Sequence, residues 1–262
     1  MMVSTRNSIA VWPKVSAQFV LDALLPRRCM CCEQKIGYSD GLCGSCWRKM
    51  PFLDMPWCQR LGVPFTHDVG DNAVSPQAII SPPVFNKHRS VAKYSGPARD
   101  LVLGLKFLGR RELAKPMGLW MTRSGSDFLS SSSLVIPVPL HWVRLWQRRF
   151  NQAADLGAAI AKVAGCEYDP QILVRTRRTR QQVRLTAKER QKNVRSAFKL
   201  KAERQNEVAG RQVVLVDDVY TTGSTITACT KTLLAAGAGS VDVLTFAYAS
   251  PSDSADVISA DL

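Results

Sequence analysis

Several stretches of the chain are apolar without interruption, a pattern typical of strands that are buried on both faces. Such runs occupy Ser133–Leu140, Val213–Val216 and Val241–Tyr248, and a shorter one occupies Gln171–Arg175. Because strands buried on both faces occur mainly in parallel sheets covered by helices, these runs predict a parallel β-sheet.

Between these runs, apolar residues recur at helical spacing. Residues 98–121 read as two helices separated near Gly109, and Asn151–Gly165 reads as a helix that Gly165 terminates. A further helix is expected to start near Ile226, shortly after the run at Val213–Val216. Strands and helices therefore alternate, which predicts an α/β fold in which helices flank the parallel sheet.

The N-terminal part of the chain has a different pattern. An amphipathic helix is expected at Val15–Leu25, a cysteine-rich segment follows from Cys29, and turn-forming residues fill Thr66–Pro83. We find no internal repeat. The sequence predicts four parts: an N-terminal helix with a cysteine-rich module at 1–65, a linker at 66–83, the α/β domain at 84–249 and a disordered tail at 250–262.

Length and apolar runs limit the cellular location. The 262 residues suffice for a sizeable core, but no run of about 18 apolar residues is free of charges, and the N-terminus lacks the apolar region of a secretion signal. We therefore expect a cytoplasmic protein without membrane insertion.

The cysteines are concentrated near the N-terminus, with six of the eight in the first 58 residues. Two Cys-x2-Cys pairs separated by ten residues have the spacing of a tetrahedral zinc site. The predicted ligands of this structural Zn²⁺ are Cys29, Cys32, Cys43 and Cys46, which makes the module similar to a zinc ribbon. The alternative is a set of unligated buried thiols, and the roles of Cys31 and Cys58 stay open.

The run at Val213–Val216 leads into the acidic pair Asp217 and Asp218 and then into a hydroxyl-rich loop. Ligands bind at the carboxyl ends of strands in open α/β sheets. The loop residues that can surround a phosphate with N–H groups and hydroxyls are Thr221, Thr222, Gly223, Ser224 and Thr225. The carboxylates can accept hydrogen bonds from ribose hydroxyls. The alternative is an ordinary strand-to-helix turn capped by Thr222 or Ser224.

Positive charge is concentrated after the shorter apolar run. The formal net charge is +14, and residues 175–204 hold twelve Lys and Arg against two Glu, a net of +10. Such a segment attracts polyanions, although a solvated basic surface is the simpler alternative.

Three arginines before this segment offer planar donors to phosphate oxygens: Arg144, Arg148 and Arg149. The alternative is that they belong to a surface turn with Trp142 and Trp146 packed beneath.

The string VVLVDDVYTTGST at Val213–Thr225 resembles the motif that binds 5-phosphoribosyl-1-pyrophosphate (PRPP) in type I phosphoribosyltransferases. With the cysteine module before it and RRFNQA and TRRTRQQVRLTAKERQKNVRSAF between them, most of the chain resembles the ComF/GntX family of phosphoribosyltransferase-like competence proteins. Two departures are visible: Leu61 stands third after Cys58, so a second zinc knuckle is incomplete, and Arg149 stands where glycine is usual.

This resemblance implies a type I phosphoribosyltransferase-like fold and a role for each motif. Asp217 and Asp218, the catalytic candidates, would hold the ribose hydroxyls, and Thr221–Thr225 would hold the 5-phosphate. The turn after Val138 with its arginines would face pyrophosphate, Mg²⁺ would accompany PRPP, and Arg175–Ala197 would form a lid over the substrate.

The family implies DNA uptake and utilization as the biological setting. The leading hypothesis is a glycosyltransferase that binds PRPP and Mg²⁺, transfers the phosphoribosyl group to a nitrogen nucleophile and releases pyrophosphate. The alternative is a non-catalytic protein whose basic segment and zinc module contact single-stranded DNA or the uptake machinery. Base salvage is a third hypothesis, and the sequence does not name an acceptor.

Overall fold

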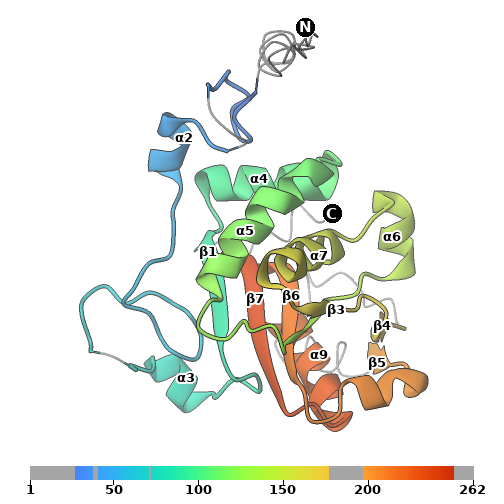
Figure 1. The fold of residues 1–262 in the computed structure, drawn as a ribbon. Coiled ribbons are helices and arrows are strands. Elements are labelled where there is room, and N and C mark those ends of the chain that lie inside the picture. Colours follow the sequence, from blue (N-terminus) through green and yellow to red (C-terminus); the bar gives the residue numbers. More distant parts are fainter. Residues whose placement is uncertain (1–26, 38–40, 71, 177–196, 251–262) are drawn as a thin grey trace, which may run out of the picture. The chain divides into compact units, whose positions relative to one another are not determined.

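The structure, a computed structural model, describes residues 27–37, 41–70, 72–176 and 197–250 (Figure 1). The chain divides into two compact units, Met1–Trp47 and Arg48–Leu262. The helix expected at Val15–Leu25 and the tail after Ser250 lie outside the described residues. No helix among the described residues is long and apolar enough to span a membrane.

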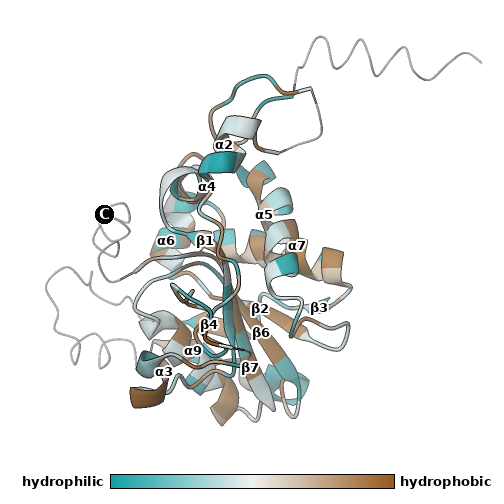
Figure 2. Ribbon diagram, turned by 90° about the vertical axis from the view of Figure 1, so that its left-hand side faces the viewer, coloured by the Kyte–Doolittle hydropathy of each residue, from teal (hydrophilic) through white to brown (hydrophobic). Residues whose placement is uncertain are grey.

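The larger unit is built on a five-stranded sheet in which all neighbouring strands are parallel, as expected (Figure 1). In spatial order the strands are β1 (His88–Lys93), β7 (Ser240–Tyr248), β6 (Gln212–Tyr220), β2 (Leu134–Pro137) and β3 (Glu167–Tyr168). Figure 2 shows hydrophobic residues along β6, in agreement with the apolar run at Val213–Val216.

Two elements differ from the expected sheet. The run at Gln171–Arg175 forms β4 (Leu173–Arg175), which pairs antiparallel with β5 (Phe198–Leu200) outside the main sheet. The edge strand β1 is buried but has no apolar run. Its polar residues His88 and Arg89 are buried together with their hydrogen-bond partners. Burial of partnered polar groups removes the signal on which the strand prediction relied.

The helices of the larger unit are α3 (Pro76–Ile80), α4 (Gly96–Phe107), α5 (Ala114–Ser124), α6 (Trp142–Arg148), α7 (Gln152–Ala164) and α9 (Ser224–Ala235), with 3₁₀ turns η1 (Arg111–Leu113) and η3 (Ala202–Glu207). Helices α4, α5, α7 and α9 agree with the spacing of apolar residues, whereas α3 and α6 were not expected. The helix expected at Asn151–Gly165 is confirmed, with the Asn151 side chain at its start and Gly165 in the left-handed conformation at its end.

The two faces of the sheet are covered by different helices. Helices α5 and α7 pack closely, since a methyl group on Gly118 would lie 2.6 Å from the Ala159 side chain, and Gly157 of α7 lies beside Val135 of β2. On the opposite face, residues of α9 share a core with Val213 and Leu215 of β6. Successive strand residues therefore face different helices.

Residues 48–65, which the sequence places in the cysteine-rich module, belong to the larger unit. The reason is backbone pairing with the edge strand β1: Leu53 N donates to Val91 O at 2.9 Å, and Lys93 N donates to Pro51 O at 2.9 Å. The predicted linker at 66–83 contains α3 and also lies in this unit. The division between the units thus falls between Trp47 and Arg48, upstream of the expected linker.

Candidate functional site

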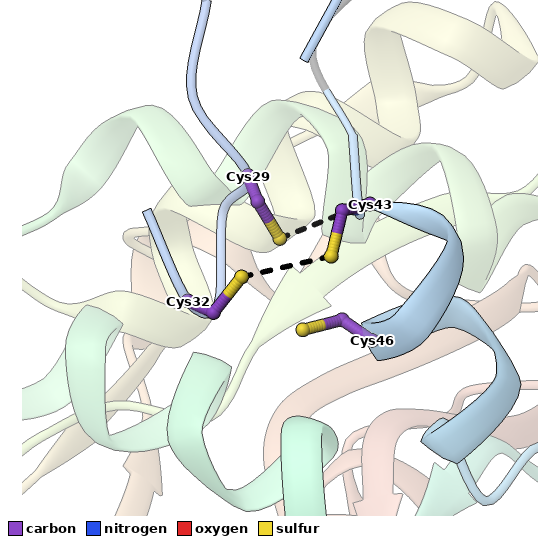
Figure 3. Close-up of side chains that lie close together, drawn as sticks. All are labelled: Cys29, Cys32, Cys43 and Cys46. Atoms are coloured by element: carbon purple, nitrogen blue, oxygen red, sulfur yellow. Dashed lines mark hydrogen bonds between the residues drawn. The ribbon is translucent and has the colours of Figure 1, made fainter. Parts of the chain in front are cut away.

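The four predicted zinc ligands converge in the structure (Figure 3). The ligand atoms of Cys29, Cys32, Cys43 and Cys46 all lie within 4.8 Å of one another. Cys31 is not a member of this group. Four thiolates at this separation form the donor set of a structural zinc site, so these residues fit Zn²⁺.

The surroundings of the thiols favour deprotonation of one of the four cysteines. The Ser45 hydroxyl lies 3.0 Å from Cys43 Sγ and is the main reason why the pKa of Cys43 is lowered to about 6. The Cys43 N–H donates to Cys29 Sγ at 3.2 Å. Burial instead raises the pKa of Cys46. Because zinc binds the thiolate, a bound cation would offset this cost of burial.

The predicted acidic pair lies on β6, which is longer than expected. The strand continues through Asp217 and Asp218 to Tyr220, paired with β7 as far as Tyr248. Adjacent strand residues point to opposite faces of a sheet. The structure therefore does not bring the two carboxylates together: Asp217 shares the α9 face with Leu215, and Asp218 faces α4.

Asp218 forms a buried ion pair that the sequence did not predict. Lys106 Nζ of α4 lies 3.2 Å from Asp218 Oδ1, and both side chains are almost fully buried. The other oxygen, Asp218 Oδ2, is buried and has no hydrogen-bond partner among the described residues. Asp218 thus retains a buried acceptor beside its ion pair.

The predicted phosphate loop joins β6 to α9. Gly223 has φ 69° and precedes the first helical residue, Ser224, two residues earlier than expected. A methyl group at this position would overlap the Tyr220 hydroxyl, so glycine is required for both backbone and space. Among the described residues, no side chain caps α9: Thr222 and Ser224 hydrogen-bond to each other at 2.9 Å. The capped-turn alternative is therefore absent from this geometry.

A pocket of about 250 Å³ opens beside this loop. Its lining residues carry no formal charge and come from three parts of the larger unit: Leu61, Val63, Gln77, Tyr220, Thr221, Thr222 and Tyr248. The rings of Tyr220 and Tyr248 are stacked with centroids 6.0 Å apart. Burial raises the pKa of Tyr220 to about 12, so its hydroxyl stays protonated. The pocket is thus neutral, partly aromatic and adjacent to Thr221 and Thr222.

The three predicted pyrophosphate-side arginines lie on or next to α6. Arg148 stacks over the Phe107 ring at 4.9 Å, and Arg149 ends the helix with φ 63°. Arg144 is partly buried and close enough to Arg175 to lower its pKa, after the larger effect of burial. The alternative with packed tryptophans is wrong, because Trp142 and Trp146 are 70% and 82% exposed.

The basic segment begins and ends in the β4–β5 pair. Arg175 pairs with Phe198 across this small sheet, and Thr176 N donates to Ala197 O at 2.9 Å. The residues between them, 177–196, and hence the lid predicted from them, lie outside the described residues. Arg175 itself is mostly buried, stacks on the Phe198 ring at 5.4 Å and interacts electrostatically with Asp217.

Sequence reasoning missed three residues of this site. Lys106 lies in an ordinary amphipathic helix, and Tyr248 ends an apolar run, so neither carried a signal. Arg175 was read only as the first residue of the basic segment. All three are brought to the carboxyl end of β6 by tertiary packing alone.

Two family models match the two parts of the chain. Residues 20–78 match the double zinc ribbon domain, and residues 153–259 match the phosphoribosyl transferase domain. Together with the four clustered cysteines, the first match supports structural zinc. The second match supports the type I phosphoribosyltransferase-like fold that the sequence motif predicts.

Curated proteins are similar over most of the chain. The DNA utilization protein YhgH of Escherichia coli (strain K12) is 32% identical over 225 residues, which cover 84% of this chain and 96% of that protein. Competence protein F of Haemophilus influenzae is 29% identical over 82% of this chain and 94% of its own length. Competence protein ComFC of Bacillus subtilis is 27% identical over 75% of this chain and 79% of its own length.

Proposed function

Because this chain belongs to the ComF family, which includes the DNA utilization protein YhgH and competence protein F, we propose that it is a phosphoribosyltransferase that serves DNA uptake and use. The protein binds PRPP with Mg²⁺. A nitrogen nucleophile forms a bond to C1 of the ribose, the C1–O bond to pyrophosphate breaks, and pyrophosphate leaves with the electron pair. The nitrogen then loses a proton.

The observation that carries this proposal is the start of α9. The first turn of a helix presents unpaired N–H groups with a positive dipole, and here no described side chain caps them. Gly223 lets the backbone approach an anion, the Thr222 and Ser224 hydroxyls lie 2.9 Å apart on either side of it, and Thr221 precedes them in the loop. These groups would hold the 5-phosphate of PRPP.

An acidic residue of β6 would serve the sugar, and the metal would accompany the substrate. Asp217 is half-buried, and its carboxylate would accept hydrogen bonds from the ribose hydroxyls, whereas Asp218 is buried beside Lys106. Mg²⁺ binds oxygen donors and keeps several waters. Because Asp217 and Asp218 lie on opposite faces of the strand, the ion would be held largely by substrate oxygens and water. Bound Mg²⁺ would neutralise charge that develops on the departing pyrophosphate.

Arginines would complete the pyrophosphate side. Arg144 of α6 lies close to Arg175 of β4, and Arg175 interacts electrostatically with Asp217 of β6. Residues from three elements therefore meet at this place. Guanidinium groups bind phosphate oxygens in a bidentate manner. Because two neighbouring cations repel each other, an anion between them lowers their electrostatic energy. Arg149 is exposed and would reach an anion from the end of α6.

The neutral pocket beside Thr221 and Thr222 would take the acceptor. A pocket without charged side chains favours an uncharged nucleophile, and the Tyr220 and Tyr248 rings suit a flat one. Catalysis would come from positioning and from stabilising charge, and no covalent protein nucleophile is required.

Titration calorimetry with PRPP and Mg²⁺ tests the proposal on the zinc-loaded protein. We expect the wild-type protein to release or absorb heat on binding PRPP. Its affinity should fall at least tenfold when Thr221 and Ser224 are both changed to Ala. Thr232→Ala is the matched control, because its hydroxyl bonds only to Ala228 O at the other end of α9. No binding by the wild-type protein would exclude the proposal, and equal binding by the double variant would remove the loop from it.

A second candidate function rests on the exposed tryptophans of α6. Trp142 and Trp146 are four residues apart, so they lie on one side of the helix, which also carries Arg144 and Arg148. Exposed aromatic rings among cations are typical of platforms on which single-stranded nucleic-acid bases stack. The protein would then bind single-stranded DNA without transferring a phosphoribosyl group.

Fluorescence anisotropy with a labelled single-stranded oligonucleotide tests this second function. Changing both tryptophans to Ala would weaken binding at least tenfold, and changing Arg177, Arg178 and Arg180 to Ala would reduce its salt dependence. Leu145→Ala, on the same exposed helix, is the control. Unchanged affinity in the tryptophan variant would dismiss the platform.

A further inference from the structure

Residues 27–36 and 56–65 adopt the same backbone arrangement, although their sequences show no repeat. Each has one isolated antiparallel bridge, Arg28 with Lys35 in the first and Trp57 with Pro64 in the second. In both copies the bridge encloses a cysteine, Cys29 or Cys58, directly after its first residue. The two segments are thus related by a shift of 29 positions.

The hydrogen bonds inside the two copies agree one by one. The cysteine N–H donates to the carbonyl five residues later, from Cys29 to Gln34 and from Cys58 to Val63, both at 2.8 Å. The cysteine carbonyl accepts from the fourth residue after it, at 3.0 and 2.8 Å. That residue has φ 62° in both copies, and it is Glu33 in the first and Gly62 in the second. This is the geometry of one tight turn built twice.

The correspondence continues into the second half of each copy. The N–H of Cys43 donates to Cys29 Sγ at 3.2 Å, and the N–H of Ser75 donates to Cys58 Sγ at 3.2 Å. A short helix starts one residue later in each case, α2 (Gly44–Lys49) in the first copy and α3 in the second. We use the word corners for the four zinc-ligand positions of the first copy and for the four equivalent positions of the second. They correspond in this order: Cys29 to Cys58, Cys32 to Leu61, Cys43 to Ser75 and Cys46 to Ala78.

The double zinc ribbon match at 20–78 covers both sets of corners and would imply a metal ion in each. The second set does not fit one. Leu61 and Ala78 have no ligand atom, and the Ser75 hydroxyl accepts the Ala78 N–H at 3.4 Å. Only Cys58 retains a thiol, whereas a structural zinc site needs four donors.

Apolar burial takes the place of the metal. Cys58, Leu61 and Ala78 are 0%, 8% and 4% exposed and belong to the same core as Phe85 and Val243. The Cys58 sulfur accepts two backbone N–H groups, from Leu61 at 3.4 Å and from Ser75. The copy is also bonded to β1, because the Leu61 carbonyl lies 2.8 Å from His88 Nδ1. A segment that shares the main core does not depend on a metal for its fold.

We propose that residues 56–78 are a ribbon that has lost its metal site and now forms a fixed wall of the larger unit. The chain binds zinc only through Cys29, Cys32, Cys43 and Cys46. Leu61, Val63 and Gln77 of the metal-free ribbon line the pocket beside the phosphate loop. The shape of that pocket is therefore independent of metal.

Metal analysis by mass spectrometry of the purified full chain tests this directly. We expect one zinc ion per chain, none after Cys29→Ser with Cys32→Ser, and still one after Cys58→Ala. Two ions in the wild-type chain, or loss of the single ion in Cys58→Ala, would overturn the proposal.

A reconstruction tests the correspondence of the corners. The triple variant Leu61→Cys, Ser75→Cys, Ala78→Cys has four cysteines in the second set and should bind a second zinc ion. The matched control carries Leu61→Cys, Ser75→Cys and Gln77→Cys, which moves the last thiol by one position, and should bind one. Circular dichroism confirms folding of both. A folded triple variant that still binds one ion would overturn the assignment.

Discussion

Lys106 Nζ of α4 lies 3.2 Å from Asp218 Oδ1 of β6, and this pair is buried beneath the carboxyl end of the strand. Removal of one partner from a buried ion pair leaves an uncompensated charge, which costs about 3–5 kcal/mol. We therefore expect Lys106→Met to lower the free energy of unfolding by about this amount in urea denaturation.

A double variant shows whether the cost comes from the stranded carboxylate. Lys106→Met combined with Asp218→Asn should recover part of the stability, because no buried charge remains. Lys115→Met, an exposed lysine on α5, should change stability by less than about 0.5 kcal/mol. If Lys106→Met behaves like Lys115→Met, the ion pair does not contribute to folding.

Gly223 should be irreplaceable for two separable reasons. Ala in the left-handed conformation costs about 1–2 kcal/mol, and here its methyl group would also overlap the Tyr220 hydroxyl. Gly210 has φ 72° and open space around it, so Gly210→Ala carries the backbone cost alone. We expect Gly223→Ala to be less stable than Gly210→Ala in thermal unfolding and to be the one of the two that weakens PRPP binding. Equal loss in both would exclude the steric effect.

His88 should make the fold sensitive to mild acid. Burial, as the main cause, lowers its pKa to about 4 from the ordinary 6.5, although the Leu61 carbonyl opposes this. The unfolded chain therefore binds a proton between these values that the folded chain does not bind. Stability from this group is complete above pH 6.5 and decreases as the pH falls toward 4, by about 2 kcal/mol between pH 7 and pH 5.

Urea denaturation at pH 7 and pH 5 measures this dependence. His88→Leu should be less stable at pH 7, because Thr245 and Ser90 lose a hydrogen-bond partner, but its stability should change less between the two pH values. His67→Leu is the control, since His67 is exposed. An unchanged pH dependence in His88→Leu would assign the acid sensitivity to other groups.

Arg149 occupies a position that suits glycine. It ends α6 with φ 63°, a conformation that costs a side chain about 1–2 kcal/mol and glycine little. Arg149→Gly should raise the free energy of unfolding by about 0.5 kcal/mol, because the greater freedom of glycine in the unfolded chain offsets part of the gain. Arg149→Ala removes the same charge but retains the backbone strain. If the free energy of unfolding rose as much in Arg149→Ala as in Arg149→Gly, the backbone explanation would be contradicted.

The parts of the fold that the sequence predicted are those where local pattern and tertiary structure agree. The apolar runs of β2, β6 and β7 and the helical spacing of α7 could be read directly. Strand β6 was expected to end before Asp217, because two adjacent carboxylates seldom continue a buried strand. Lys106 makes this continuation tolerable, and it lies more than a hundred positions away in the chain.

The repeated ribbon could not be read from the sequence for a related reason. Three of the four corners in the second copy are Leu61, Ser75 and Ala78, and the spacing between its halves is thirteen residues where the first copy has ten. What the copies share is backbone hydrogen bonding, which many sequences can form. The motif that did predict a site, Thr221–Thr225, required one backbone conformation, which Gly223 provides.

The pairing of Thr176 with Ala197 means that the twenty positions from 177 to 196 enter and leave the fold at a single point. The entropy of closing a loop rises by only about 0.6 kcal/mol for each doubling of its length. Insertions, deletions or an entire graft at this place should therefore change the stability of the scaffold only slightly.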